Sequence, residues 1–130
     1  MQRSISPQLA LYTPAAGLKP LQVGSYRHVV AMVTVTVAGT AASVARFKGT
    51  VQDAVPAFAS AASATNFHTG VQAKNLDTGA TINGTTGIPV DATGVFMYEI
   101  NTNFIEWLGL DLTSITGAVF TIDVVAAAGT

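Results

Sequence analysis

The stretch VVAMVTVTV, residues 29 to 37, decides the fold class of this chain. It is dominated by β-branched residues, which favour extended backbone over helix. Its second half alternates with the period of a β-strand, so that one face carries Val33, Val35 and Val37 and the other carries Thr34 and Thr36. The residues Ala-Gly-Thr at 38–40 then end the pattern. We therefore expect a strand with one buried face.

The next run, ASVARFKGTVQ at residues 42–52, has the same period. Ala45, Phe47, Gly49 and Val51 alternate with a more polar set, namely Val44, Arg46, Lys48 and Thr50. The alternation predicts a strand with one apolar and one solvated face, on which Arg46 and Lys48 lie together. Because only a short break separates the two runs, we expect them to form a hairpin.

Further strands are expected along the rest of the chain. They lie around Val71, at 88–90 where Pro89 interrupts the run, and in VFMYEI (95–100), IEWLGLDL (105–112) and AVFTIDVVA (118–126). Turn residues occur at 77–79 (DTG) and 83–84 (NG), and the Ala-rich segment 53–66 is expected to be a loop. About eight short strands without an amphipathic helix predict an all-β fold, a single-domain β-sandwich or jelly-roll-like barrel.

The first twenty residues differ from this β-rich part. Pro7, Pro14 and Pro20 disfavour helix and favour extended backbone, which predicts an extended N-terminal arm over 1–20 before a β-sandwich domain over 21–130. The apolar residues of the arm would be badly placed in a free tail, so the arm packs on a neighbouring chain or is an ordinary frayed terminus. These residues are Ile5, Leu9, Leu11, Tyr12 and Leu18.

Composition favours a protein that associates with other proteins. Charged residues make up 10% of the 130 residues and the net charge is −1, against about 25% charged residues in an average soluble domain. Few charges and a net charge near zero favour association, although an exterior of Thr, Ser, Asn and Gly is the alternative. The scattered basic residues argue against nucleic acid as a partner.

The sequence has no signal peptide and no apolar run of about 18 residues, which predicts synthesis in the cytoplasm and no membrane partner. It also contains no cysteine, which excludes disulfides and thiolate chemistry. His28 and His68 are the only histidines and have no metal-ligand spacing, so a structural or surface role is expected for both. No nucleophile elbow, phosphate-binding loop or calcium loop occurs, and we expect no cofactor and no metal site.

Glu99 and Glu106 are the strongest candidates for chemistry. They flank the segment NTNF at 101–104, and if this segment is a hairpin turn the two carboxylates lie near each other across two strands. A glycosidase uses a carboxylate pair of this kind. The alternative, which we favour, is that both are solvated strand residues, because the expected cleft of aromatic and polar groups is lacking. The chain is therefore expected not to be an enzyme.

Three segments together resemble a known family. FKGTVQDAVPAFASAASATN (47–66), NLDTGATINGTTGIPV (75–90) and MYEINTNFIEWLGLDLTSITGAVFTIDVVA (97–126) are similar to small virion proteins of tailed bacteriophages, most like capsid decoration (cement) proteins. Those proteins share an F-x-G-x-V/I-Q-D strand end, an S-A/P-T-N element, an L-x-x-G-x-x-I-x-G-x-T-G-I region and an E-I/V-N-T-N-x-x-x-W element in this order. Residues 1–40 carry no part of the resemblance.

The resemblance implies a structural role without catalytic residues. It implies a homotrimer that binds the outer surface of the assembled capsid, with the major capsid protein as partner and the virion surface as location. On this basis the residues expected to anchor the chain to the capsid are Ile5, Leu9, Leu11 and Tyr12, and those expected to pack in the trimer are Phe104 and Trp107.

Two alternatives remain open. The first is a tail or head–tail structural component of the phage, which has the same β-rich composition and differs in copy number and symmetry. The second, from another class, is a carbohydrate-binding β-sandwich, in which Trp107 and Tyr98 would form the platform on which a sugar stacks.

Overall fold

The computed structural model describes residues 8–12, 21–51, 70–112 and 114–127. Within these ranges the chain is all-β and contains no helix, and so none that could span a membrane. The strands are β1 (Gln8–Tyr12), β2 (Leu21–Gln22), β3 (His28–Val37), β4 (Val44–Thr50), β5 (Ala73–Asn75), β6 (Thr81–Ile82), β7 (Ile88–Pro89), β8 (Gly94–Ile100), β9 (Trp107–Asp111) and β10 (Val119–Ala127).

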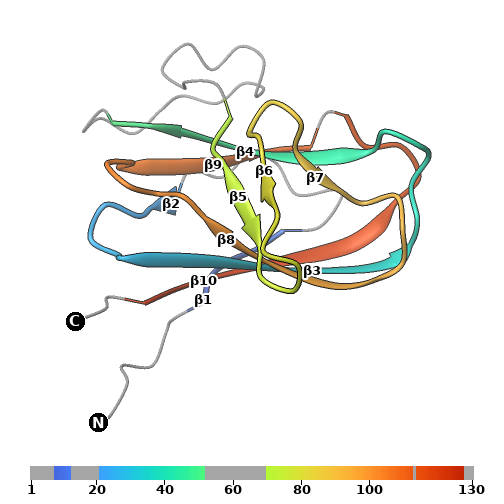
Figure 1. Cartoon of the computed structure of the whole chain (residues 1–130), viewed down its shortest axis with the longest axis horizontal. Helices are drawn as coiled ribbons and strands as arrows, with labels where there is room; N and C mark the ends of the chain where they lie inside the picture. Colours follow the sequence, from blue (N-terminus) through green and yellow to red (C-terminus); the bar gives the residue numbers. More distant parts are fainter. Residues whose placement is uncertain (1–7, 13–20, 52–69, 113, 128–130) are drawn as a thin grey trace, which may run out of the picture.

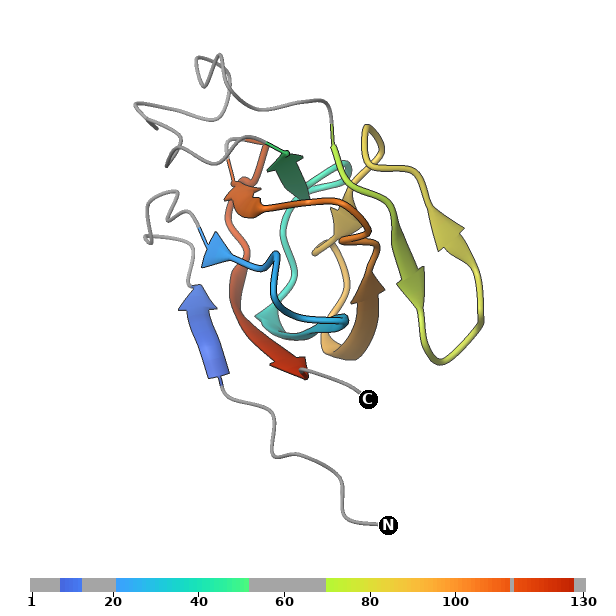
Figure 2. The same ribbon diagram turned by 90° about the vertical axis from the view of Figure 1, so that its left-hand side faces the viewer.

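The strands form two antiparallel sheets. One has six strands in the order β1-β10-β3-β8-β5-β6, and the other has four in the order β2-β9-β4-β7. Figure 1 shows the two sheets as layers, with β4 and β9 above β3 and β10, and Figure 2 shows the same layers from one end. The all-β class is confirmed, and the two layers are consistent with a β-sandwich.

The core lies between the layers, and the opening stretch provides much of it. Val29, Ala31, Val33 and Val35 of β3 are buried, as the alternation predicts, while Val37 is exposed at the end of the strand. Side chains from both sheets pack in the same core cluster, including Ile122 and Val124 of β10, Leu108 and Leu110 of β9 and Phe47 of β4. Burying one such aliphatic side chain stabilises the fold by about 1.5–3 kcal/mol, so the layered arrangement follows from these strands.

Both expected hairpins are wrong. β3 pairs with β10 and β8, whereas β4 pairs with β9 and β7 in the other sheet. Likewise β8 pairs with β3 and β5, whereas β9 pairs with β2 and β4. The connections at 38–43 and 101–106 therefore cross between the layers. The alternation of a strand determines which face is buried, but it does not determine to which sheet the strand belongs.

The end of β4 also departs from the predicted pattern. Thr50 was assigned to the solvated face but is fully buried, and Val51, assigned to the apolar face, is exposed. The backbone carbonyl of Thr50 accepts a hydrogen bond from the amide of Glu106 at 2.9 Å. Thr50 is the last residue of β4 and still pairs with Trp107 of β9, so the alternation fails at the end of the strand itself. Residue 51 is the last described before residue 70.

The predicted turns are confirmed. The side-chain oxygen of Asn75 accepts hydrogen bonds from the amides of Asp77 at 2.8 Å and Thr78 at 3.2 Å, and Gly79 has a φ of 76°. The side-chain oxygen of Asn83 accepts a hydrogen bond from the amide of Thr85 at 3.0 Å. These are the Asx turns that such residues favour. The Ala-rich segment 53–66, which was expected to be a loop, lies outside the described residues.

The chain passes from one sheet to the other at residues 70–75. Gly70 forms a bridge with Lys48 of β4, and the amide of Val71 donates a hydrogen bond to the carbonyl of Phe47 at 2.7 Å. A strand was expected around Val71, and β5 begins two residues later, at Ala73, as a neighbour of β8. On the other sheet Pro89 lies in β7, the edge strand, where a missing amide costs no ladder hydrogen bond.

The expected N-terminal arm is described only in part. The backbone of β1 pairs with β10 in the same chain, with Leu11 opposite Asp123 and Tyr12 opposite Ile122. The remaining residues of the range 1–20 lie outside the described residues. The strand is an edge of the six-stranded sheet, and an extended arm over the whole range stays a prediction.

Candidate functional site

The most unusual local structure is the connection between β8 and β9. The residues 101–106 (NTNFIE), which we name the crossover, are held at both ends by backbone hydrogen bonds. The amide of Asn101 donates to the carbonyl of Gln72 at 2.9 Å, and the carbonyl of Glu106 accepts from the amide of Val23 at 2.8 Å. Within it, the amide of Ile105 donates to the carbonyl of Thr102 at 3.0 Å. The crossover is therefore a defined turn between the two sheets.

Phe104 stands out from the crossover in two respects. Its side chain is 94% exposed, and its φ of 65° lies in the left-handed region. That conformation costs an L-residue other than glycine roughly 1–2 kcal/mol, and a large aromatic side chain in water forgoes the stabilisation of burial. A residue that carries both costs is a candidate for function rather than for folding.

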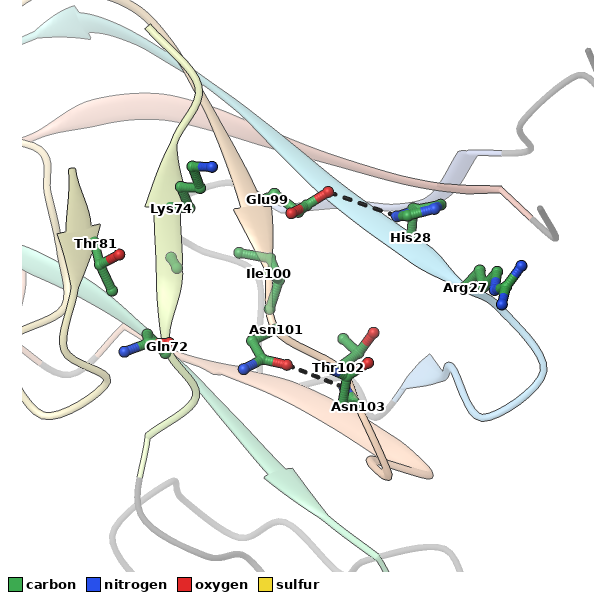
Figure 3. A pocket seen from close by; sticks show the side chains of 11 residues that line it. Arg27, His28, Gln72, Lys74, Thr81, Glu99, Ile100, Asn101, Thr102 and Asn103 are labelled. Atoms are coloured by element: carbon green, nitrogen blue, oxygen red, sulfur yellow. Dashed lines mark hydrogen bonds and ion pairs between the residues drawn. The ribbon is translucent and has the colours of Figure 1, made fainter. Parts of the chain in front are cut away.

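Two hollows adjoin the crossover. The first has a volume of about 330 Å³ and is bordered by strand ends of the six-stranded sheet, as Figure 3 shows, and the second has about 240 Å³. They share Arg27, Thr102 and Asn103 in their lining. The first is lined mainly by amide, hydroxyl and charged side chains, including Gln72, Lys74, Thr81, Glu99 and Asn101. Such groups can hydrogen-bond a polar ligand.

The two glutamates do not form a pair. Glu99 lies on β8 and lines the first hollow, where its carboxylate is 3.6 Å from Nδ1 of His28 (Figure 3). Glu106 lines the second hollow and accepts a hydrogen bond from the side chain of Gln22 at 2.7 Å. The two strands that they adjoin belong to different sheets. The expected proximity across a hairpin is therefore wrong, and the acid pair required by a glycosidase is not brought together in one hollow.

The contact between His28 and Glu99 is a surface interaction. Both side chains are about half exposed, and an ion pair in that setting contributes at most about 1 kcal/mol. His68 lies outside the described residues. Among the residues that are described, no three side chains of His, Asp or Glu gather as metal ligands would.

Arg46 and Lys48 lie on the same face of β4, as predicted, and both contact the protein itself. The guanidinium of Arg46 donates to the carbonyl of Thr85 at 2.8 Å and to the hydroxyl of Ser114 at 2.7 Å. The ammonium of Lys48 lies 3.5 Å from the carboxylate of Asp111, which is almost completely buried. Arg46 and Lys48 thus both connect β4 to neighbouring segments, and the ammonium of Lys48 compensates the buried charge of Asp111.

The carbohydrate-binding alternative used Trp107 and Tyr98 as the platform on which a sugar stacks, and for Tyr98 this prediction is wrong. Tyr98 is 2% exposed and belongs to the core of the six-stranded sheet, so its ring has no free face. Trp107 is half-buried on β9, in the other sheet. The alternation of VFMYEI allowed either face of β8 to be the buried one, and burial of Phe96, Tyr98 and Ile100 decided it.

The residues expected to anchor the chain lie at its N-terminus. Leu9, Leu11 and Tyr12 are in β1, whose backbone pairs with β10, and Ile5 lies outside the described residues. The anchoring role of the four stays a prediction, as does the packing of Phe104 and Trp107 in a trimer.

The sequence reasoning missed an apolar patch on the outer face of the six-stranded sheet. Met32 of β3 is the register partner of Met97 of β8, and these side chains are 37% and 44% exposed. Val95, 63% exposed, lies two residues from Met97 on the same strand face, and the amide of Leu76 donates to the carbonyl of Met97 at 2.9 Å. We name Met32, Leu76, Val95 and Met97 the outer patch. The alternation of β8 does not reveal the outer patch, because Val95 and Met97 alternate with core residues that are also apolar.

The chain was also compared with protein-family models, with curated proteins and with solved structures, and none of the three comparisons gave a match.

Proposed function

We propose that this chain is a bacteriophage capsid decoration protein, which binds the outer surface of the assembled capsid as a homotrimer and stabilises it. The observation that carries the proposal is the ordered set of motifs in segments 47–66, 75–90 and 97–126. These motifs resemble those of small phage virion proteins, and the chain is also β-rich and poor in charge, as those proteins are. The function is structural, without a reaction, a metal or a cofactor.

The strand order supports a jelly-roll arrangement of the proposed sandwich. One sheet runs β1-β10-β3-β8 and the other β2-β9-β4-β7, so that early and late strands alternate in both. Two interleaved sheets of four strands, built from Greek keys, are the jelly-roll pattern found in viral capsid proteins. The hairpin of β5 and β6 is then an insertion that extends the first sheet beyond β8.

Exposed apolar side chains support a function in assembly. Phe104 on the crossover and the outer patch together leave five large apolar side chains in contact with water. Exposed apolar patches such as the outer patch mark surfaces that bind other proteins. With only 10% charged residues in the chain, little of the surface opposes such contacts.

Stabilisation of the shell would follow from mass action. A protein that binds the assembled lattice, and not separated subunits, lowers the free energy of the lattice. A trimer contacts the shell three times, so contacts that are weak one by one hold together by avidity. In this proposal an N-terminal arm with Ile5, Leu9, Leu11 and Tyr12 reaches the major capsid protein.

One observation favours a second candidate, a carbohydrate-binding β-sandwich. The first hollow collects amides, hydroxyls and charged groups beside the crossover, and a sugar is bound by groups of this kind. The exposed ring of Phe104 adjoins the second hollow, and it would replace Tyr98 as a stacking surface.

The test is the location and copy number of the chain in purified phage particles, measured by quantitative mass spectrometry and by electron microscopy of labelled particles. The proposal expects many copies on the capsid surface, in multiples of three at symmetric lattice positions. A few copies at the tail would instead identify a tail or head–tail component, and absence from the particle would overturn both.

A companion experiment tests attachment. Shells that lack the protein are mixed with the full chain or with a variant that lacks residues 1–12, and bound protein is counted after sedimentation. We expect the full chain to saturate the shells and to delay their thermal disruption, whereas the truncated variant binds weakly. Equal binding of both would contradict the anchoring role of the N-terminal residues. Binding to a glycan panel but not to shells would favour the carbohydrate candidate.

A further inference from the structure

The first hollow collects the two described cations that the fold does not use. The structure describes four basic side chains, and two of them, Arg46 and Lys48, contact the protein itself. The other two, Arg27 and Lys74, both line the first hollow. Within the described part of the chain, their side chains form no hydrogen bond and no ion pair. The cations that are free to meet a ligand therefore lie at one place.

The strand order explains how these side chains come together. β8 lies between β3 and β5 in the sheet, and it ends at Ile100, where the crossover begins. Arg27 precedes β3 on one side, and Lys74 of β5 lies on the other side, as Figure 3 shows. Because neighbouring strands lie about 4.8 Å apart, the backbones that carry the two cations are about 10 Å apart across the sheet. The hollow at the end of β8 thus has a cation on either side.

The one carboxylate of the hollow does not cancel this charge. Glu99 is the register partner of Lys74 and lies 3.6 Å from Nδ1 of His28, so it has two basic neighbours on the same sheet face. Arg27 and Lys74 against Glu99 leave one net positive charge when His28 is neutral. The whole chain has a net charge of −1. The hollow is therefore a local positive site, which attracts an anionic group.

The rest of the polar lining is suited to hydroxyl groups. Gln72, Asn101 and Asn103 contribute side-chain amides, and Thr81 contributes a hydroxyl. A primary amide both donates and accepts hydrogen bonds, so it can bind the hydroxyls of a sugar, which also do both. The side-chain oxygen of Asn101 accepts a hydrogen bond from the backbone amide of Asn103 at 3.3 Å. This bond orients the side chain of Asn101 and leaves its NH₂ group available to a ligand.

We propose that the first hollow binds a saccharide that carries carboxylate groups, such as an oligomer of a uronic acid. Arg27 and Lys74 each face a carboxylate, and the amides between them bind the hydroxyls of the sugar rings. Such an oligomer repeats the carboxylate along its length, which matches cations about 10 Å apart, whereas a small inorganic anion lacks the hydroxyls. The inference goes beyond capsid decoration and does not rest on it. For the carbohydrate-binding candidate, it names the class of ligand.

The test is a titration of the isotope-labelled full chain, followed by NMR. The probe is a trimer of galacturonic acid, and the matched control is its full methyl ester, which keeps the hydroxyls and loses the charges. Because the hollow is open to water, we expect a dissociation constant on the order of 1 mM for the acid. The side-chain amides of Gln72, Asn101 and Asn103 should shift. The ester should bind about fivefold more weakly, and inorganic phosphate more weakly still.

Variants separate the two cations from a general effect of charge. Arg27→Gln and Lys74→Gln should each weaken binding of the acid by about fivefold, as expected for the loss of one exposed charged contact. Gln72→Ala should weaken binding of the acid and the ester alike. The double variant Arg27→Gln with Asp91→Asn restores the net charge at an exposed residue outside the lining, and it should bind as weakly as Arg27→Gln alone. Recovery of binding in the double variant would overturn the proposal.

The remaining outcomes separate this inference from the proposed function. Absence of shifts at a tenfold higher concentration of the acid, or equal binding of acid and ester, would overturn the carboxylate site. Equal affinity for phosphate and the acid would show an anion site without preference for a saccharide, and would overturn it as well. A protein that decorates the capsid but does not bind the acid keeps the proposed function. A protein that binds the acid but is absent from the particle loses that function and keeps this site.

Discussion

Tyr98 has a different role in the structure from the one that the sequence suggested. In the sequence it is an aromatic residue beside a carboxylate and a candidate for sugar stacking. In the structure its ring is in the core, and burial raises the pKa of its phenol above the ordinary value of 10.0. The cause is the loss of water around the charged form. Tyr98 thus contributes to the stability of the fold, and its buried phenol makes the free energy of unfolding depend on pH in the alkaline range.

The sign of this dependence follows from proton binding. Up to about pH 10 the phenol is protonated in both the folded and the unfolded chain, so the contribution of Tyr98 is fully present. At higher pH the unfolded chain loses the proton first, because its pKa is lower, and stability falls until the folded pKa is reached. Tyr98→Phe should remove this part of the alkaline loss.

The measurement is the free energy of unfolding in urea between pH 8 and 11. The wild-type protein should lose more stability over this range than Tyr98→Phe does. Parallel curves for the wild-type protein and Tyr98→Phe would contradict the argument.

At the scale of the elements, periodicity predicted the positions of the main strands well and the buried faces of β3 and most of β4. The runs at 29–37, 42–52, 95–100 and 118–126 contain or nearly match β3, β4, β8 and β10. Pairing was predicted wrongly, because a hairpin and a crossover between layers have the same alternation and similar connection lengths. The connections differ in long-range contacts, such as that between the amide of Glu106 and Thr50, and no local pattern contains these.

The candidate site was predictable to a smaller extent. The segment around Phe104 was recognised as important through its resemblance to other sequences, but its exposure and left-handed backbone were not foreseen. The outer patch could not be recognised, because Val95 and Met97 are as apolar as Phe96 and Tyr98, which face the core. Which of two apolar faces is buried depends on the second sheet, which covers only one of them.

Gly84 lies in a predicted turn, and it also makes a close backbone contact with another segment of the chain. Asn83 and Gly84 were predicted to form a turn, and Gly84 is not among the residues with positive φ. A Cβ on Gly84 would overlap the backbone of Gly70, and the reverse also holds. Glycine is therefore required because the segment before β5, at Gly70, and the loop after β6 touch through their backbones.

Gly84→Ala should consequently destabilise the protein strongly. Overpacking costs about 1–3 kcal/mol when side chains can yield, and here the neighbour is backbone, so we expect the upper part of that range or more. The matched control is Gly79→Ala, because Gly79 has open space around its Cβ position but a φ of 76°. It should cost roughly 1–2 kcal/mol from the left-handed backbone alone. Urea unfolding measures both, and an equal loss would contradict the contact.

At the scale of the whole molecule, the scarcity of charge is the dominant property. The net charge of −1 comes from six basic and seven acidic residues, and the pI is about 6.0. The large apolar side chains of the outer patch face water in a single copy. Electrostatic repulsion between copies is weakest near the pI, so unspecific association through apolar surface is strongest there. Specific assembly with a fixed number of copies depends on complementary surfaces and not on weak electrostatic repulsion near the pI.

The two kinds of association can be separated by their pH dependence. Solubility of the protein, measured as the saturating concentration between pH 4.5 and 8, should pass through a minimum near pH 6. Val95→Glu adds a negative charge to the outer patch at an exposed position, so it should raise the solubility and move the minimum to lower pH. The trimer of the proposed function should persist on both sides of the minimum, because specific assembly with closed symmetry ends at a fixed number of copies. A solubility that does not vary with pH, or that follows the fraction of trimer, would show that one contact is responsible for both.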